Sequence, residues 1–84
     1  MPRYYFHSED GRRFPDEEGT ELPSDDAARL EAVRVLGELL RERPELFWDH
    51  ECFRVTVTDH SALTLFILEL GVVTSPAAAK RRAG

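Results

Sequence analysis

The residues of this sequence that could support chemistry gather near its N-terminus, where a histidine precedes a run of acids. His7 is followed by Asp10, Asp16, Glu17 and Glu18. An imidazole beside carboxylates suits a divalent metal ion or acid–base chemistry near neutral pH. The spacing matches neither a two-histidine helical motif nor an EF-hand loop. Three hypotheses stay open: a metal or ligand site at His7, Asp10, Asp16 and Glu18, acid–base catalysis by the same cluster, or a structural His7 that packs on the sheet and hydrogen-bonds a loop. We favour the structural His7.

The acids from Asp16 to Glu21 also have a structural explanation as a solvent-exposed loop. In that interpretation Glu18 or Glu21 accepts hydrogen bonds from backbone N–H groups. The alternative is an acidic docking surface for a basic partner.

The single cysteine, Cys52, excludes an internal disulfide and a multi-cysteine zinc site. Paired with His50 or His60 it could act as a nucleophile. No glycine-rich element that would build an oxyanion hole accompanies it, and a small buried hydrophobic side chain at the start of a strand is the simpler interpretation. We therefore predict no catalytic residue, no cofactor and no enzyme activity.

The elements that must position these residues follow from turn signals and hydrophobic periodicity. Strands are expected at 2–8, 12–14, 53–58 and 63–68, and a helix is expected from Ser24 to Pro44, with loops at 16–23 and 45–50. The predicted fold class is α+β: a small ββαββ domain whose antiparallel sheet of three to four strands carries one helix on one face. Residues 1–73 would form this single domain, and residues 74–84 a flexible basic tail.

The predicted helix has one apolar stripe at the spacing of a buried face, formed by Ala28, Ala32, Val35, Leu36 and Leu39. Leu30, Val33 and Leu40 flank this stripe or lie outside it. Gly37 costs about 1 kcal/mol relative to alanine inside a helix, which suggests a close approach to another backbone.

Four apolar residues are candidates for binding a partner. In the last predicted strand, Leu63, Leu65 and Ile67 match the inward face of the preceding strand, so Phe66 and Leu68 would point outward. Phe47 and Trp48 follow the helix and would either cap the core or form an exposed hot spot. An apolar outward face on a terminal strand invites aggregation unless it is covered. We expect a second copy of the chain to cover it, which predicts a homo-oligomer.

The net charge of -5 is unevenly distributed. Residues 1–26 carry -5, residues 27–76 carry -3, and the last eight residues carry +3 from Lys80, Arg81 and Arg82. An acidic body disfavours nucleic-acid binding, and three basic residues would neutralise only about three phosphates. No apolar stretch approaches the roughly 18 residues of a membrane span. We expect a cytoplasmic protein that binds neither nucleic acid nor a membrane.

The opening MPRYYFH, the following DG, the stretch DEEGTELPS and an alanine-rich helix containing EA form a recognisable combination. With these features the chain resembles a domain-of-unknown-function family of short bacterial proteins, whose members open MPRY-[F/Y]-F-H and continue D-x-E-G-x-E-x. The resemblance covers residues 1 to about 68. Family members commonly end with L-T-V-P-F, where this chain has Leu63-Thr64-Leu65-Phe66-Ile67, so Phe66 replaces a proline that would protect a strand edge. The resemblance implies no function.

A looser likeness runs to the N-terminal domain of HicB-type antitoxins, which place a turn and an acid-capped, alanine-rich helix after the first hairpin, as residues 16–28 do here. It implies at most a partner-binding scaffold. Our leading functional hypothesis is a non-enzymatic protein-interaction module that self-associates. The alternatives are an antitoxin-like or nucleic-acid-associated regulator, and a small metal- or ligand-binding protein centred on His7.

Overall fold

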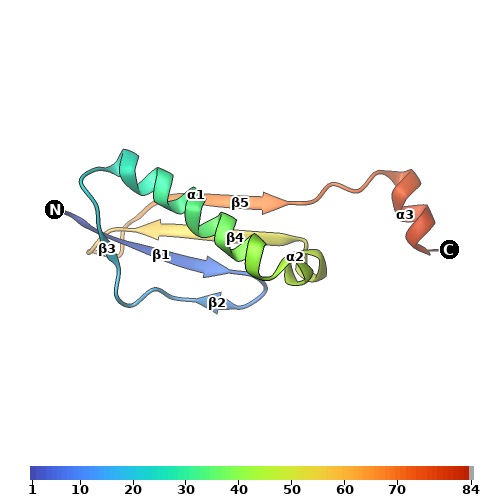
Figure 1. Ribbon diagram of the computed structural model, residues 1–84, viewed down its shortest axis with the longest axis horizontal. Helices are drawn as coiled ribbons and strands as arrows, with labels where there is room; N and C mark the ends of the chain where they lie inside the picture. Colours follow the sequence, from blue (N-terminus) through green and yellow to red (C-terminus); the bar gives the residue numbers. More distant parts are fainter. Residues whose placement is uncertain (84) are drawn as a thin grey trace.

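The computed structural model describes residues 1–83 and shows an α+β fold (Figure 1). Five antiparallel strands and three helices follow one another in the order β1 (Arg3–Glu9), β2 (Arg13–Phe14), β3 (Thr20–Glu21), α1 (Asp25–Glu42), α2 (Pro44–His50), β4 (Cys52–Thr58), β5 (Thr64–Gly71) and α3 (Pro76–Ala83). The predicted fold class and its two-hairpin core are confirmed. The sequence did not predict β3, α2 or α3.

The sheet has the strand order β2-β1-β4-β5. β3 also pairs with β1 but stands outside this linear order. β2 and β3 both lie along the edge of β1 that faces away from β4. Ser8 pairs with Phe14 at one end of that edge, and Tyr4 pairs with Thr20 at the other. β5 occupies the opposite edge of the sheet and pairs with β4. The two edges therefore differ: one is covered by short strands, and the other is a long strand with a free side.

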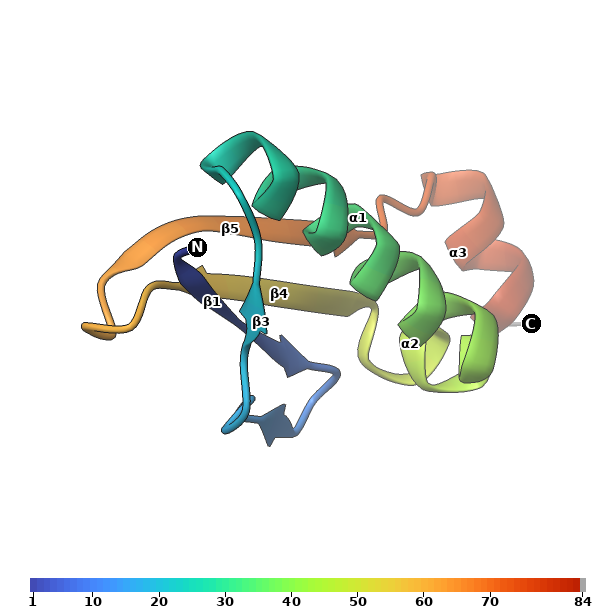
Figure 2. The same ribbon diagram turned by 60° about the vertical axis from the view of Figure 1, so that its left-hand side comes forward.

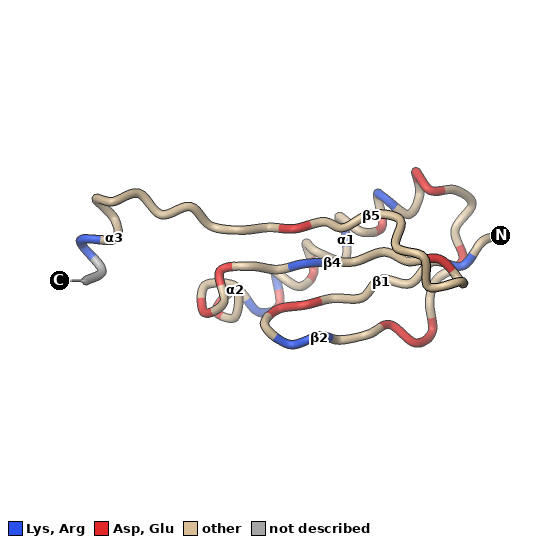
Figure 3. Tube along the Cα trace, turned by 180° about the vertical axis from the view of Figure 1, so that it is seen from behind, with Lys and Arg blue, Asp and Glu red and all other residues tan. Residues whose placement is uncertain are grey.

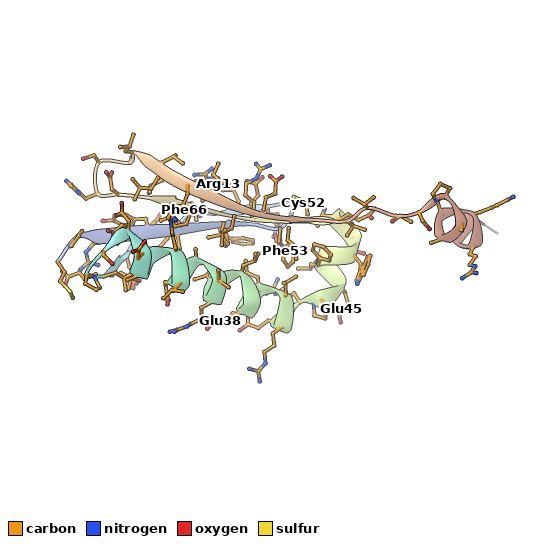
Figure 4. The ribbon with its side chains drawn as sticks, turned by 90° about the horizontal axis from the view of Figure 1, so that it is seen from above. Arg13, Glu38, Glu45, Cys52, Phe53 and Phe66 are labelled. Carbon is orange, nitrogen blue, oxygen red and sulfur yellow. The ribbon has the colours of Figure 1, made fainter. Side chains whose placement is uncertain are left out.

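α1 packs on one face of the sheet, as the stripe of apolar residues predicted. Ser24 caps the helix by accepting a hydrogen bond from the N–H of Ala27 at 3.2 Å. Ala28 and Ala32 are fully buried, and these small side chains allow the helix to lie close to Tyr4, Phe6, Val55 and Val57. Figures 2 and 4 show α1 and α2 on the same side of the sheet, with Phe53 and Phe66 between the layers and Arg13 on the far side.

Two predictions about the helical region are wrong. Residues 45–50 form most of α2 rather than a linker, because Pro44 takes the first position of a new helix, where a missing N–H costs nothing. Gly37 does not approach another backbone, since a Cβ built on it would meet no atom within 4 Å.

The orientation predicted for the last strand is right for Leu65, which packs against the core, but wrong from Phe66 onward. Val57 pairs with Phe66 and Val55 with Leu68, so Phe66 and Leu68 lie on the helix side with the core, and Ile67 points to the opposite face. The cause is an irregularity in the register between Val57 and Thr58, which leaves one extra residue in β5. One inserted residue reverses the alternation of side chains that the sequence pattern assumes.

The C-terminal segment leaves the body after Gly71 and ends in α3, which makes no contact with another element within residues 1–83 (Figure 1). The molecule consequently measures 54 × 21 × 21 Å. The sequence predicted a flexible basic tail at residues 74–84 and did not predict a helix there. Alanine favours helix strongly, and Ser75 caps the segment by accepting a hydrogen bond from the N–H of Ala78. Gly84, the last residue of the predicted tail, lies outside the described residues. None of the helices in residues 1–83 has the length and apolar character needed to cross a bilayer.

Candidate functional site

His7 lies on the face of the sheet away from α1, with both ring nitrogens hydrogen-bonded. Its Nδ1 accepts a hydrogen bond from the backbone N–H of Asp16 at 3.0 Å, and its Nε2 lies 3.0 Å from the hydroxyl of Thr58. Because Nδ1 accepts, the proton of a neutral ring is on Nε2, which donates to Thr58. The ring of Tyr5 stacks beside it at 6.4 Å between centroids. Neither nitrogen has a lone pair free for a metal ion in this arrangement.

The Asp16 carboxylate holds three backbone N–H groups. Oδ2 accepts from Phe6 at 3.1 Å, and Oδ1 accepts from Glu18 at 3.1 Å and Gly19 at 3.0 Å. Partial burial by itself raises the pKa of Asp16, but the hydrogen bonds from Gly19, Phe6 and Glu18 outweigh it, and the pKa lies below its ordinary value of 3.8. The charged form of Asp16 is therefore part of the folded structure.

Together His7 and Asp16 close the middle of the β1 edge. β3 covers Arg3 and Tyr4, β2 covers Ser8 and Glu9, and the N–H of Phe6 between them donates to the side chain of Asp16. The expectation that Glu18 or Glu21 would hold the backbone of this loop is wrong. The carboxylate of Glu21 instead pairs with Arg3 at 3.2 Å.

The other members of the suggested metal set do not converge on His7. Asp10 is buried at the end of β1, where it accepts a weak hydrogen bond from the N–H of Arg12 at 3.4 Å and lines a hollow with Ser8 and Phe14. Glu18 contributes its backbone to the loop, and its carbonyl oxygen accepts from Arg3. Within residues 1–83, no three His, Cys, Asp or Glu side chains are placed to bind a metal ion together.

Cys52 is half-buried at the start of β4 and shares a small hollow with His50, Glu9, Gly11 and Arg54. Gly11 has a positive φ of 98°, and a Cβ there would lie 2.5 Å from the His50 ring, so any other residue would strain the backbone and displace this imidazole. His60 lies in the turn beyond the other end of β4, so the structure brings one of the two histidines close to Cys52.

Phe47 and Trp48 differ in burial. Phe47 is buried and meets Phe53 edge to face at 5.4 Å between centroids, which closes the end of the core. Trp48 packs its edge on Phe47 but remains 59% exposed. Of this predicted pair, only Trp48 offers surface to a partner.

An apolar accessible surface lies where α1 meets the edge of β5 that does not pair with β4. A shallow groove there is lined by Arg29 and Val33 of α1 and by Phe66, Ile67 and Leu68 of β5. The Arg29 guanidinium lies 6.0 Å from the centre of the Phe66 ring, within the range of a cation–π contact. Val33 is 60% exposed and Ile67 is 52% exposed. We name these five residues the β5 groove.

Sequence reasoning identified Phe66 and Leu68 as partner-binding candidates but gave the wrong reason, and it missed Arg29, Val33 and Ile67. A usable signal was present in α1. Leu30 and Val33 are apolar residues outside the buried stripe, and the structure leaves them 73% and 60% exposed. Surplus apolar residues beside a complete stripe indicate a second surface to be covered.

The negative charge of Glu69 on β5 is paired with an arginine of the neighbouring strand β4. The only charged residue of β5 is Glu69, and its carboxylate accepts hydrogen bonds from Arg54 at 2.8 Å and 2.6 Å. The bond to Glu69 raises the pKa of Arg54 further above its already high ordinary value. Figure 3 shows a single acidic position along β5, whereas the β1 side of the sheet carries several charges.

Fold and site together define a small α+β domain in which one helical layer covers an antiparallel sheet and one sheet edge is open beside an apolar groove. The chain belongs to the family described as Domain of unknown function (DUF6894), whose sequence model matches residues 3–71. The match begins with β1 and ends with the last residue of β5, so it includes both the closed edge and the open one. No curated protein and no solved structure matched the chain.

Proposed function

We propose that this chain is a non-catalytic interaction module that binds an extended polypeptide along the free edge of β5. The observation that carries the proposal is that β5 is a long strand with one edge unpaired among the described residues. β5 is eight residues long, contains neither proline nor lysine, and pairs only with β4 among the described residues. Proteins ordinarily protect such an edge with prolines, inward charges, bulges or a covering segment, because its unpaired N–H and C=O groups recruit another strand.

The opposite edge supports the proposal by contrast. There the chain uses two short strands and the carboxylate of Asp16 to cover the backbone of β1. The register irregularity near Thr64 bends only the start of β5 and leaves the part from Phe66 onward regularly paired. The chain covers the edge of β1 with its own segments and leaves β5 without a second strand among the described residues, which supports a role for β5 in strand addition.

The β5 groove supplies side-chain contacts beside the free backbone. Strand addition gains affinity from main-chain hydrogen bonds and selectivity from pockets that accept alternate side chains. Phe66 and Leu68 form the floor of the groove, and Val33 forms the wall toward α1. An added strand would place its apolar residues over Phe66 and Leu68 and leave the intervening ones on the opposite face of the sheet.

The experiment is selection from a displayed library of random peptides about twelve residues long, enough to span a typical strand. Selected peptides should alternate apolar and polar residues, and Ile67→Lys and Val33→Lys should each abolish their binding. Trp48→Lys is the matched control, because it places the same charge at an exposed apolar site on α2. Loss of binding in Trp48→Lys alone, or selection of no peptide by a folded chain, would contradict the proposal.

A further inference from the structure

We propose that the strand bound at this edge is β5 of a second copy, joined antiparallel across a two-fold axis at Ile67 so that the two sheets become one. The proposal rests on the proposed function and names the partner of the same site. Each copy would contribute the same strand, Thr64–Gly71, to the contact. A two-fold dimer requires only that this strand be complementary to itself.

The position of the axis follows from the alternation of side chains. A two-fold axis perpendicular to a sheet keeps each side chain on its own face, so residues opposite each other across the new contact point to the same side. The axis then passes midway between one residue and the same residue of the second copy. With Ile67 at the axis, the two Ile67 side chains meet on the open face. On the helix side, Phe66 of each copy lies opposite Leu68 of the other. The three central pairs are then entirely apolar.

The neighbouring choice, with Leu68 at the axis, is less favourable. It would place Ile67 opposite Glu69 of the second copy and bring the two Glu69 carboxylates to diagonal positions roughly 7–8 Å apart. With Ile67 at the axis, the two Glu69 residues lie about four positions apart along the joined strands rather than two, and each keeps its own Arg54. Charge therefore favours Ile67 over Leu68.

The groove and helix α1 fit the same axis. Ile67 lies between Phe66 and Leu68, whose side chains line the groove on the helix side, so a two-fold axis at Ile67 places each groove beside that of the other copy. Figure 1 shows α1 lying obliquely across the sheet, with its N-terminal end on the β5 side and its C-terminal end toward β1. In the pair, both α1 helices lie on one face of the joined sheet. Val33 and Leu30, exposed in the single chain, then line the gap between these helices.

The first test is the mass of the chain in solution, measured by sedimentation or light scattering over a concentration series. The parent chain should be a dimer. Ile67→Lys would place two like charges opposite each other at the axis and should raise the dissociation constant at least about thirtyfold, which corresponds to a hot-spot loss of about 2 kcal/mol. Trp48→Lys should leave it unchanged. Circular dichroism and urea denaturation establish that each variant is folded.

A second test reads the register directly and does not depend on a destabilising charge. In a Cys52→Ser background, Ile67→Cys should form a disulfide-linked dimer on mild oxidation, because a residue at the axis faces its own copy within about 4.5–5.5 Å between Cβ atoms. Glu69→Cys lies away from its copy in this register and should cross-link far more slowly.

The outcomes separate the two proposals. A folded parent chain that stays monomeric at high concentration, while peptides still bind at the β5 groove, overturns the dimer and leaves the interaction module standing. A dimer that Trp48→Lys dissociates and Ile67→Lys does not also overturns it. Cross-linking that is faster at Glu69→Cys than at Ile67→Cys refutes the register. Failure of both dimerisation and peptide binding removes the two proposals together.

Discussion

Replacing Asp16 by alanine tests whether one carboxylate closes the edge of β1. The substitution removes the acceptor of three backbone N–H groups, those of Phe6, Glu18 and Gly19. Phe6 is only 8% exposed, and leaving its N–H without an acceptor costs about 1–3 kcal/mol. The other two bonds lie nearer the surface, where water replaces part of each, and together they contribute about 1 kcal/mol. Asp16→Ala should therefore lower the free energy of unfolding by about 2–4 kcal/mol.

Asp59→Ala is the matched control for this substitution. The Asp59 carboxylate also holds a turn, accepting from the N–H groups of Ser61 at 2.8 Å and Leu63 at 3.0 Å. Both bonds are exposed, so their loss leaves no buried donor without a partner and should cost about 1 kcal/mol. Urea denaturation followed by circular dichroism measures both differences, and an unchanged slope would show that the denatured states remain comparable.

Amide hydrogen exchange locates the effect. The N–H of Phe6 should exchange faster in Asp16→Ala and remain protected in Asp59→Ala, since only the first substitution removes its acceptor. Equal destabilisation of the two variants, with the Phe6 amide still protected in both, would refute the assignment of Asp16 as an edge-closing residue.

Acid provides an independent check on the charge of Asp16. Its pKa lies below 3.8 in the folded chain, so the unfolded chain takes up this proton at a higher pH than the folded one. The stabilisation is consequently present above about pH 4 and is lost as the pH falls through the folded pKa. The stability difference between the parent and Asp16→Ala should shrink over that acidic range and stay constant near neutral pH.

Three further substitutions test the packing, the helix and one hydrogen bond. Phe53→Ala empties a fully buried position and should cost about 3–5 kcal/mol in urea denaturation, against at most about 1 kcal/mol for the exposed Trp48→Ala; similar losses would contradict the assigned core. Gly37→Ala should raise stability by about 0.5–1 kcal/mol, because a Cβ there meets no neighbour, and a loss would show that something approaches it. The Tyr4 hydroxyl donates to Asp25 at 2.6 Å, and this bond, with burial, raises the pKa of Tyr4 to about 12. In a spectrophotometric titration, the tyrosine that ionises near pH 12 should be absent from Tyr4→Phe. In the parent, the stabilisation by the Tyr4–Asp25 hydrogen bond should be intact below pH 10.0 and disappear as the pH rises toward 12.

Local patterns predicted the central elements well. Ser24 followed by acids marks the start of α1, and the stripe from Ala28 to Leu39 marks its buried face. In β4, strict alternation placed Phe53, Val55 and Val57 in the core, where each is fully buried. These features depend on residues close together in the chain, and periodicity reports such features reliably.

The candidate site was predicted only in part, because its decisive features are long-range. His7 was favoured as a structural residue hydrogen-bonded to a loop, and the structure places it in that arrangement. No local pattern indicates that Asp16 would donate its backbone N–H to His7 or that its carboxylate would accept from Phe6. Nor does any pattern reveal the register irregularity beside Thr58, which reversed the orientation predicted for Phe66.

The sequence by itself determined the α+β class, the cap and buried face of α1, the phase of β4 and membership of a recognisable family. Each of these follows from short-range spacing, backbone preference or direct resemblance. Only the tertiary structure decided which sheet edge is closed and which is open. That difference depends on which strand lies beside which, and on one extra residue in β5 that turns Phe66 and Leu68 toward α1. A pattern of period two cannot show either, because inserting one residue reverses every position after it.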